Sequence, residues 1–404
     1  MLYWGLAASA GVLSIIALIY DLEQMYFIAV TVLGLPWLSR ILSANVRHTL
    51  RAAVQTSGEI KLHAGDMASV RVAIYNSGRM PRSLCRASLD LPEGLELVRE
   101  RTDQVDILAP DSATHLDVRF RPTRRGVYQV DRARVLTTDF MGIFEFAVDL
   151  DDIDILVTAW PRLHGARRMP WLENQASDMD SYDLHALEDG SSHGEVATDF
   201  FGVREYVPGD EIRRIHWPST ARHQAFTVIE YVSQQRGSLT LFLDLDRSSY
   251  DQPGGDEALE EAISLVATVS RVAISQAIPV RIVAQGEEDY SLARQEGLSD
   301  MEIILDRLAR VDADGDQPLD LIVRRRARIA QEGGIVLVTA RHDGVLERAQ
   351  AAASAASRTS RALVVDAESF AGGGERTAPS AIGRNGALAL AKGDDPVAFL
   401  ERAR

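Results

Sequence analysis

Two long uncharged stretches open the chain. Residues 2–20 carry no charged side chain, and residues 24–39 carry none after the polar break at Asp21-Leu22-Glu23. A helix of that length spans most of a hydrocarbon core of about 30 Å. The pattern predicts a transmembrane helical hairpin over residues 1–45. A cleaved signal peptide is the alternative, but it needs a basic start and a small-residue cleavage site, which this segment lacks.

The positions of the arginines predict the orientation of this hairpin. The loop between the two apolar stretches has no Lys or Arg, whereas Arg40, Arg47 and Arg51 follow the second stretch. Basic residues favour the cytoplasmic side of a membrane. We therefore expect a bacterial-type plasma-membrane protein with two transmembrane helices, whose N-terminus and soluble domains are cytoplasmic.

Residues 46–164 change to a period of two, which is typical of half-buried strands. Examples are residues 69–75 and 115–120, where apolar and polar side chains alternate. Turn signals such as Asn76-Ser77-Gly78 separate the alternating runs. The pattern predicts an all-β, immunoglobulin-like sandwich. Such modules usually bind a partner or act as spacers between other parts of a protein.

The middle of the chain is irregular and then highly charged. Residues 165–195 are rich in Asp, Ser, Glu and Gly and predict a linker. Residues 196–238 combine charged and aromatic side chains around the turn Pro208-Gly209. Their candidate binding residues are Arg204, Glu205, Asp210, Arg213, His216, Trp217 and Arg222. We favour an ion-pair lattice that joins two domains; a recognition or catalytic cluster, or an arginine site for an anion, is the alternative.

Residues 239–404 alternate buried-type strands with amphipathic helices. This order predicts a doubly wound α/β domain with a parallel sheet. Ligands of such sheets bind beyond the carboxyl ends of the strands. Asp244, Asp246 and Ser248 follow the first strand there, and Thr339 and Asp343 follow a later one.

The spacing of Asp244, Asp246 and Ser248 suggests a site for a hard cation. Oxygen donors at alternating positions after a strand project into one pocket, and Mg²⁺ is the candidate ion. The alternative is that the carboxylates cap the next helix. The β-rich module, by contrast, shows no catalytic constellation.

Composition narrows the functional classes. The formal net charge is −15, from 43 Lys and Arg against 58 Asp and Glu. The sequence shows no separate cluster of basic residues. Such a chain is not expected to bind nucleic acid. The single Cys85 excludes an internal disulfide and a cysteine-rich metal site, and it fits a reducing compartment.

The start of the α/β region resembles sequence motifs of two protein families. The DxDx pattern resembles the first motif of haloacid-dehalogenase-type phosphatases, which implies Asp244 as nucleophile and Asp246 as acid/base. Thr339 resembles their second motif, but Lys392 stands too near Asp394-Asp395 for the third. The pattern is more similar to the DxSxS motif of von Willebrand factor A-like domains, with Asp244 and Ser248 matching and Asp246 replacing the first serine.

Longer motifs extend across the chain. The string FFGVREYVPGDEIRRIHWPSTAR, together with TRRGVYQVDRARVLTTDFMGIF and AWPRL, resembles the family catalogued as domain of unknown function 58. Members are typically encoded beside MoxR-type AAA+ ATPases and transglutaminase-like membrane proteins. The resemblance implies an assembly or chaperone-like role as a membrane-anchored partner of the ATPase. Our first hypothesis is therefore a membrane-anchored interaction or scaffold protein that is not an enzyme. The alternative is a metal-dependent hydrolase of phosphatase type using Asp244 and Asp246.

Overall fold

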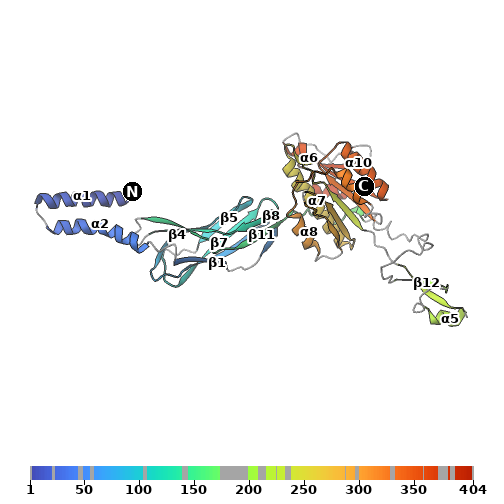
Figure 1. Ribbon diagram of the computed structural model, residues 1–404, viewed down its shortest axis with the longest axis horizontal. Coiled ribbons are helices and arrows are strands. Elements are labelled where there is room, and N and C mark those ends of the chain that lie inside the picture. The colour runs from blue at the N-terminus through green and yellow to red at the C-terminus, as the bar shows by residue number, and fades with distance from the viewer. Residues whose placement is uncertain are drawn as a thin grey trace. The chain divides into compact units, whose positions relative to one another are not determined.

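The chain forms two compact units, Met1–Arg162 and Leu163–Arg404. They are seen in a computed structural model (Figure 1). It describes residues 2–20, 23–43, 49–54, 59–102, 107–138, 144–172, 199–207, 215–223, 225–232, 238–286, 288–295, 300–327, 333–357, 359–371, 381–382 and 387–402. The chain is therefore multidomain, with both helices and sheets.

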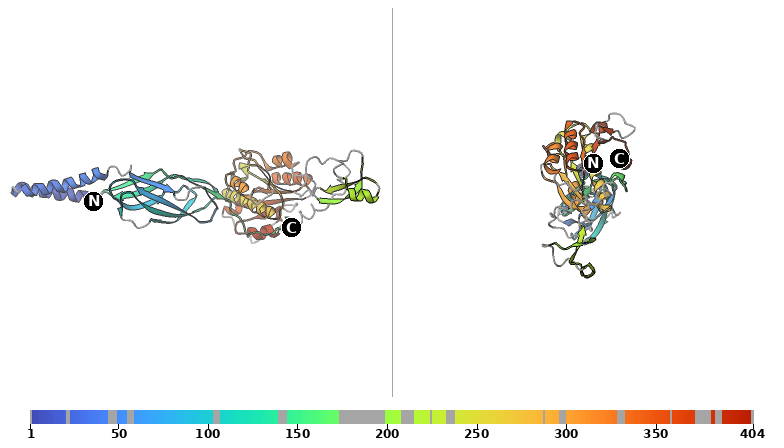
Figure 2. Two further views of the ribbon diagram at one scale, coloured as in Figure 1. Left: turned by 90° about the horizontal axis from the view of Figure 1, so that it is seen from below. Right: turned by 90° about the vertical axis from the view of Figure 1, so that its right-hand side faces the viewer.

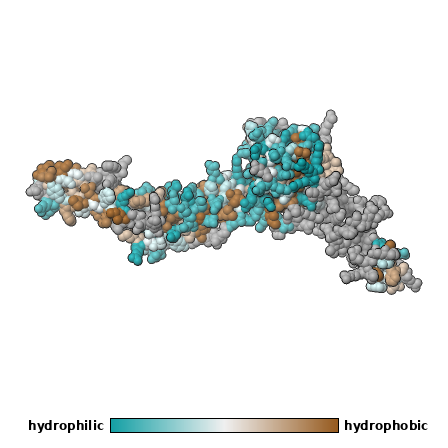
Figure 3. Space-filling view, viewed as in Figure 1, coloured by the Kyte–Doolittle hydropathy of each residue, from teal (hydrophilic) through white to brown (hydrophobic). Residues whose placement is uncertain are grey.

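The first unit begins with two apolar helices that lie side by side, α1 (Leu2–Tyr20) and α2 (Glu23–Ser43) (Figure 1). Within the described residues, the stretch Glu23–Ile41 is long and apolar enough to cross a membrane, and Ala8–Tyr20 is a shorter apolar helix. Several apolar side chains of α2 are exposed, among them Phe27 at 76%, and brown patches mark the helical region in Figure 3. One candidate N-terminal membrane helix is thus present. The second span and the cytoplasmic orientation stay predictions.

The rest of the first unit consists of strands. One four-stranded antiparallel sheet has the order β1 (Leu50–Val54), β3 (Ala68–Asn76), β7 (Ser112–Pro122), β5 (Leu95–Thr102). A second has the order β10 (Glu145–Leu150), β9 (Ala133–Thr138), β4 (Arg82–Leu89), β6 (Ile107–Leu108). A third sheet contains β2 (Ile60–His63), β11 (Ile155–Trp160) and β8 (Gly126–Val130), with β2 and β11 parallel.

These sheets share one hydrophobic core because successive side chains of a strand point to opposite faces. In β7, Leu116, Val118 and Phe120 are fully buried, whereas the intervening Arg119 is exposed. Residues from all three sheets join the same cluster. The predicted β-rich module is therefore present, and its immunoglobulin-like class stays a prediction.

The second unit contains a seven-stranded sheet. Its order is β16 (Leu292–Gln295), β15 (Val280–Ala284), β14 (Leu239–Leu243), β17 (Gly334–Thr339), β18 (Ser360–Val365), β20 (Ala387–Leu390), β19 (Ala381–Ile382). The five inner strands run parallel and the two edge strands antiparallel. From β14 the chain moves to β15 on one side, and it returns to β17 on the other.

Helices lie on both faces of this sheet (Figures 1 and 2). The long α7 (Gly255–Ser275) contacts β14, β15, β17 and β18. On the other face, α9 (Leu319–Arg326) and α10 (Gly344–Ala356) share a core with Phe242 and Leu337. The shorter helices are α6 (Arg247–Tyr250), α8 (Asp300–Leu308), α11 (Ala367–Phe370) and α12 (Pro396–Arg402).

A small hairpin precedes the sheet. It consists of β12 (Asp199–Glu205) and β13 (Thr227–Val232), which pair antiparallel, with α5 (Trp217–His223) between them. This hairpin holds most of the sequence signature. The predicted turn Pro208-Gly209 falls between these two strands and lies outside the described residues.

Part of the predicted linker, residues 165–195, is packed into the second unit. Trp171 is 2% exposed, and its Nε1 donates to the carbonyl of Leu400 at 3.0 Å. Arg271 on α7 donates to the carbonyls of His164 and Ala166. Residues 163–172 are thus anchored on α7 and α12, and residues 173–195 lie outside the described residues.

Candidate functional site

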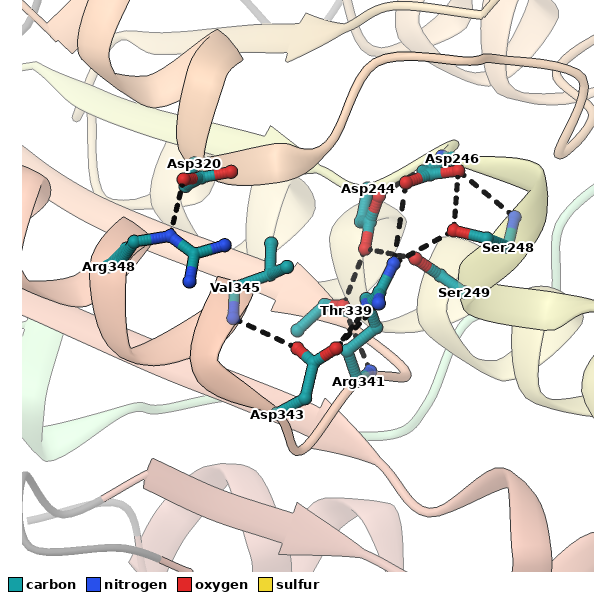
Figure 4. Close-up of polar contacts among 10 residues, drawn as sticks. All are labelled: Asp244, Asp246, Ser248, Ser249, Asp320, Thr339, Arg341, Asp343, Val345 and Arg348. Atoms are coloured by element: carbon teal, nitrogen blue, oxygen red, sulfur yellow. Dashed lines mark hydrogen bonds and ion pairs between the residues drawn. The ribbon is translucent and has the colours of Figure 1, made fainter.

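The residues predicted to share the carboxyl edge of the sheet meet at one point. β14 and β17 are neighbours, and the chain changes direction between them, so their carboxyl ends form the switch point where doubly wound sheets bind ligands. Asp244 directly follows β14, and Thr339 ends β17. Figure 4 shows their side chains facing each other.

Asp244 is fully buried and makes hydrogen bonds with both carboxylate oxygens. Its Oδ2 accepts from Thr339 Oγ1 at 2.6 Å and from Ser249 Oγ at 2.8 Å, and its Oδ1 accepts from the backbone N–H of Asp246 at 3.0 Å. Burial raises the pKa of Asp244, and the nearby charge of Asp246 also raises it, whereas these hydrogen bonds act in the opposite direction. Asp244 therefore ties the end of β14 to β17 and to α6.

Asp246 caps the first turn of α6. Its Oδ1 accepts from the backbone N–H and from the hydroxyl of Ser248, at 3.0 and 2.8 Å. This is the capping role that the sequence left open as the alternative to metal binding. Beside it, Arg247 N donates to the carbonyl of Gly315 at 2.9 Å. A Cβ at Gly315 would lie 2.8 Å from the carbonyl oxygen of Gln285, so this close approach requires glycine.

Arg341 completes the cluster, two residues after Thr339. Its Nη1 donates to Ser248 Oγ at 2.8 Å and lies 3.4 Å from Asp246 Oδ2. Its Nε and Nη2 both donate to Asp343 Oδ2, at 3.0 and 2.5 Å. Figure 4 shows the guanidinium between the two aspartates. One arginine thus connects the loop after β14 with the loop after β17.

Asp343 lies at the rim of the cluster with its side chain 48% exposed. Its Oδ1 accepts from the backbone N–H of Val345 at 3.0 Å and so caps α10. Burial alone would raise the pKa of Asp343, but the hydrogen bonds and charge of Arg341 outweigh it and lower that pKa. The same bond raises the pKa of Arg341. The pair therefore stays charged at neutral pH.

The described residues do not fit a resident cation well. Both oxygens of Asp244 already accept hydrogen bonds, and Arg341 lies against Asp246 and Ser248. Among the residues that the structure describes, no group of three or more His, Cys, Asp or Glu could hold a metal ion. The Mg²⁺ site stays a prediction that these contacts do not favour.

The phosphatase-type reaction stays a prediction, and the position of Asp244 does not favour it. A nucleophilic Asp244 would have to reach a phosphorus atom, but its side chain is fully buried. Lys392 Nζ lies 3.5 Å from the carbonyl of Phe370, an interaction on α11 rather than with Asp244. The cluster is built to hold two loops together.

The signature residues make local contacts. Arg204 Nη1 donates to the carbonyl of Glu205 at 3.1 Å, and His216 Nδ1 lies 2.7 Å from Ser219 Oγ. Trp217 is 62% exposed. Arg222, on α5, is also exposed. The predicted Asp210 and Arg213 lie outside the described residues, so the ion-pair lattice stays a prediction.

Two residues of this site, Ser249 and Arg341, were not predicted as site residues. Ser249 follows the predicted Ser248 and is 2% exposed, and Arg341 stands between the noted Thr339 and Asp343. Serine and arginine are common in loops, so residue type alone gave no signal. The position of Arg341, two residues after the end of a strand, was the available clue.

Fold and site together define a multidomain protein with an apolar N-terminal helix and a parallel α/β unit whose switch point holds a charged cluster. The family described as "Protein of unknown function DUF58" matches residues 202–359, which include that cluster. The Bacillus subtilis (strain 168) protein "Uncharacterized protein YeaD" is 26% identical over 269 residues, which cover 65% of this chain and 63% of the relative. The match therefore spans less than two thirds of that relative.

Solved structures resemble only parts of the chain. The Vibrio cholerae VesB protease shares 9% identity over 32% of this chain and 36% of its own, with a TM-score of 0.21. A non-cellulosomal cohesin from Archaeoglobus fulgidus shares 16% identity over 28% of this chain and 91% of its own, with a TM-score of 0.19. Likenesses this weak carry no argument about function.

Proposed function

We propose that this chain is a membrane-anchored interaction or scaffold protein, without catalytic activity, whose α/β domain binds a protein partner at the switch-point cluster. We define this cluster as Asp244, Asp246, Ser248, Ser249, Thr339, Arg341 and Asp343. The observation that carries the proposal is that Asp244, the candidate nucleophile, is buried and bound by three internal donors. The inner residues of the cluster therefore stabilise the fold, whereas the residues at its rim present polar groups to solvent.

The rim offers the groups that a protein partner would contact. Arg341 is 24% exposed and Asp343 48% exposed, and Arg247 is exposed on the adjacent α6. Charged groups held by a rigid framework favour specific binding, because their positions are fixed before the partner arrives. The buried bonds from Thr339 and Ser249 to Asp244 supply such a framework.

The proposed partner is a MoxR-type AAA+ ATPase, with a transglutaminase-like membrane protein as a further candidate. This part rests on the family resemblance of the signature strings. The apolar α1 and α2 support the membrane attachment, with two spans and cytoplasmic soluble domains proposed from the arginine positions. In this arrangement the chain would hold a soluble ATPase at the membrane.

The test is capture of the partner by the full chain. Tagged protein is solubilised in detergent from its native membranes, and the retained proteins are identified for the wild type and for Asp343→Ala. Asp117→Ala is the matched control, because Asp117 is also an exposed carboxylate paired with an arginine, 2.7 Å from Arg71, but it lies on β7.

Recovery of an AAA+ ATPase with the wild type and Asp117→Ala, but not with Asp343→Ala, would support the proposal. Equal recovery with both variants would overturn the role of the cluster. Retention of no ATPase under any condition would overturn the proposed partnership. In that case turnover of generic phosphate esters, lost in Asp244→Asn, would support the hydrolase instead.

A further inference from the structure

We infer that Arg341 takes the place of a divalent cation at the switch point, so that the cluster works without metal. This inference rests on the proposed function for its purpose, since it concerns how the same cluster binds a partner. It departs from the metal-dependent interpretation that the DxSxS resemblance suggests. The structural argument has three steps.

The first step is position. The guanidinium of Arg341 lies against the donors that a cation would need, 2.8 Å from Ser248 Oγ and 3.4 Å from Asp246 Oδ2. A cation bound between these oxygens would have to occupy the same space. The side chain is also held from the other side, because Asp343 Oδ2 accepts from both Nε and Nη2.

The second step is charge. Arg341 contacts the two carboxylates of Asp246 and Asp343, so one positive charge already lies between these two negative groups. An arginine cannot lose its proton under ordinary conditions, so the guanidinium would repel an incoming cation at every physiological pH. A cation could enter only if the arginine moved away.

The third step is how Arg341 is placed. Its backbone N–H donates to Thr339 Oγ1 at 3.0 Å, and the same hydroxyl donates to buried Asp244. The backbone of Arg341, from which the side chain extends, is therefore held in place at the end of β17. Removal of the guanidinium would leave Asp246 Oδ2 and Ser248 Oγ without this partner, in a site whose walls stay in place.

The experiment is a calorimetric titration of the purified, detergent-solubilised full chain with MgCl₂ and MnCl₂. Wild type and Arg341→Lys, which keeps the positive charge, are expected to give no saturable heat. Arg341→Ala is expected to bind one cation in the millimolar range or tighter, and the double variant with Asp246→Ala is expected to lose that binding. Saturable binding of one cation by the wild type, abolished by Asp246→Ala, would overturn the inference.

A folded Arg341→Ala that binds no cation would also overturn it, because the remaining oxygens would then not be a cation site. If Arg341→Ala does not fold, Arg341→Met retains the apolar part of the side chain and replaces it in the titration. If neither folds, the wild-type Mn²⁺ titration decides alone. The titration requires no partner, so its result is independent of whether the capture experiment finds an ATPase.

Discussion

At the scale of single residues, the buried hydrogen bond between Thr339 and Asp244 joins the two central strands of the sheet. A buried carboxylate is costly unless donors surround it, and here Thr339, Ser249 and a backbone N–H do so. Because burial raises the pKa of Asp244, its contribution to stability is fully present below the unfolded pKa and is lost as pH rises through the folded pKa. The donors limit that loss.

The variant Thr339→Val removes one of these donors without changing the side-chain shape. We expect it to lower the free energy of unfolding by about 1–3 kcal/mol, because a buried acceptor loses a hydrogen-bond partner. Urea denaturation at neutral pH measures the effect. The control is Thr240→Val on β14, since Thr240 Oγ1 is buried and has no hydrogen-bond partner among the described atoms. That change should be neutral or stabilising, and equal losses in the two variants would contradict the account.

At the scale of elements, an ion pair ties the loop between β15 and β16 to α9. Arg326 Nη2 lies 2.7 Å from Asp289 Oδ2, and Ser291 also donates to Asp289. Burial alone would raise the pKa of Asp289, but hydrogen bonds from Arg326 and Ser291 lower it to about 2. A depressed carboxyl pKa stabilises the fold above the unfolded pKa, and that contribution is lost as pH falls through the folded pKa.

Asp289→Asn should therefore abolish a pH-dependent part of the stability. As pH falls from the unfolded value of 3.8 towards 2, the wild type should lose stability relative to the variant. The difference at neutral pH should be about 1 kcal/mol or less, because solvent screens a pair whose Asp289 side chain is 50% exposed. Unfolding curves over this pH range measure it, and parallel pH profiles would count against the ion pair.

The segment 163–172 is also an element-scale feature, because it packs against α7 and α12. Trp171→Ala should destabilise the second unit by about 3–5 kcal/mol, since it removes a fully packed aromatic side chain. The matched control is Trp217→Ala on α5, where the side chain is 62% exposed and a change within about 0.5 kcal/mol is expected. Thermal unfolding of both variants compares them. A small effect at Trp171 would show that the segment is not anchored.

At the scale of the whole molecule, the membrane anchor proposed for α1 and α2 has a topology that can be tested. The predicted topology can be read with one cysteine, because Cys85 is the sole native cysteine. Met67→Cys in a Cys85→Ser background places a thiol at a position that is 71% exposed in the first unit. A membrane-impermeant maleimide should label it only after the cells are opened. Labelling in intact cells would place the soluble domains outside.

Much of this organisation could be predicted from the sequence, because periodicity is a local signal. The alternation in residues 115–120 predicted β7, and the order of strands and amphipathic helices in residues 239–404 predicted the parallel sheet. The shared edge of Asp244, Asp246, Ser248, Thr339 and Asp343 followed from the order of strands and helices.

The roles within the cluster could not be predicted in the same way. Whether Asp246 binds a cation or caps a helix depends on which charge lies opposite it, and that charge, Arg341, is 95 residues away in the chain. Docking of Trp171 likewise depends on Leu400, 229 residues further along. Local pattern carries no information about such contacts.

The most direct test of the central claim is the affinity of the solubilised chain for its captured partner, measured in EDTA and in Mg²⁺. The account predicts the same Kd in both buffers for the wild type, and a Kd at least about tenfold weaker, or about 1.4 kcal/mol, for Asp343→Ala. Loss of wild-type binding in EDTA, or full affinity in Asp343→Ala, would contradict it.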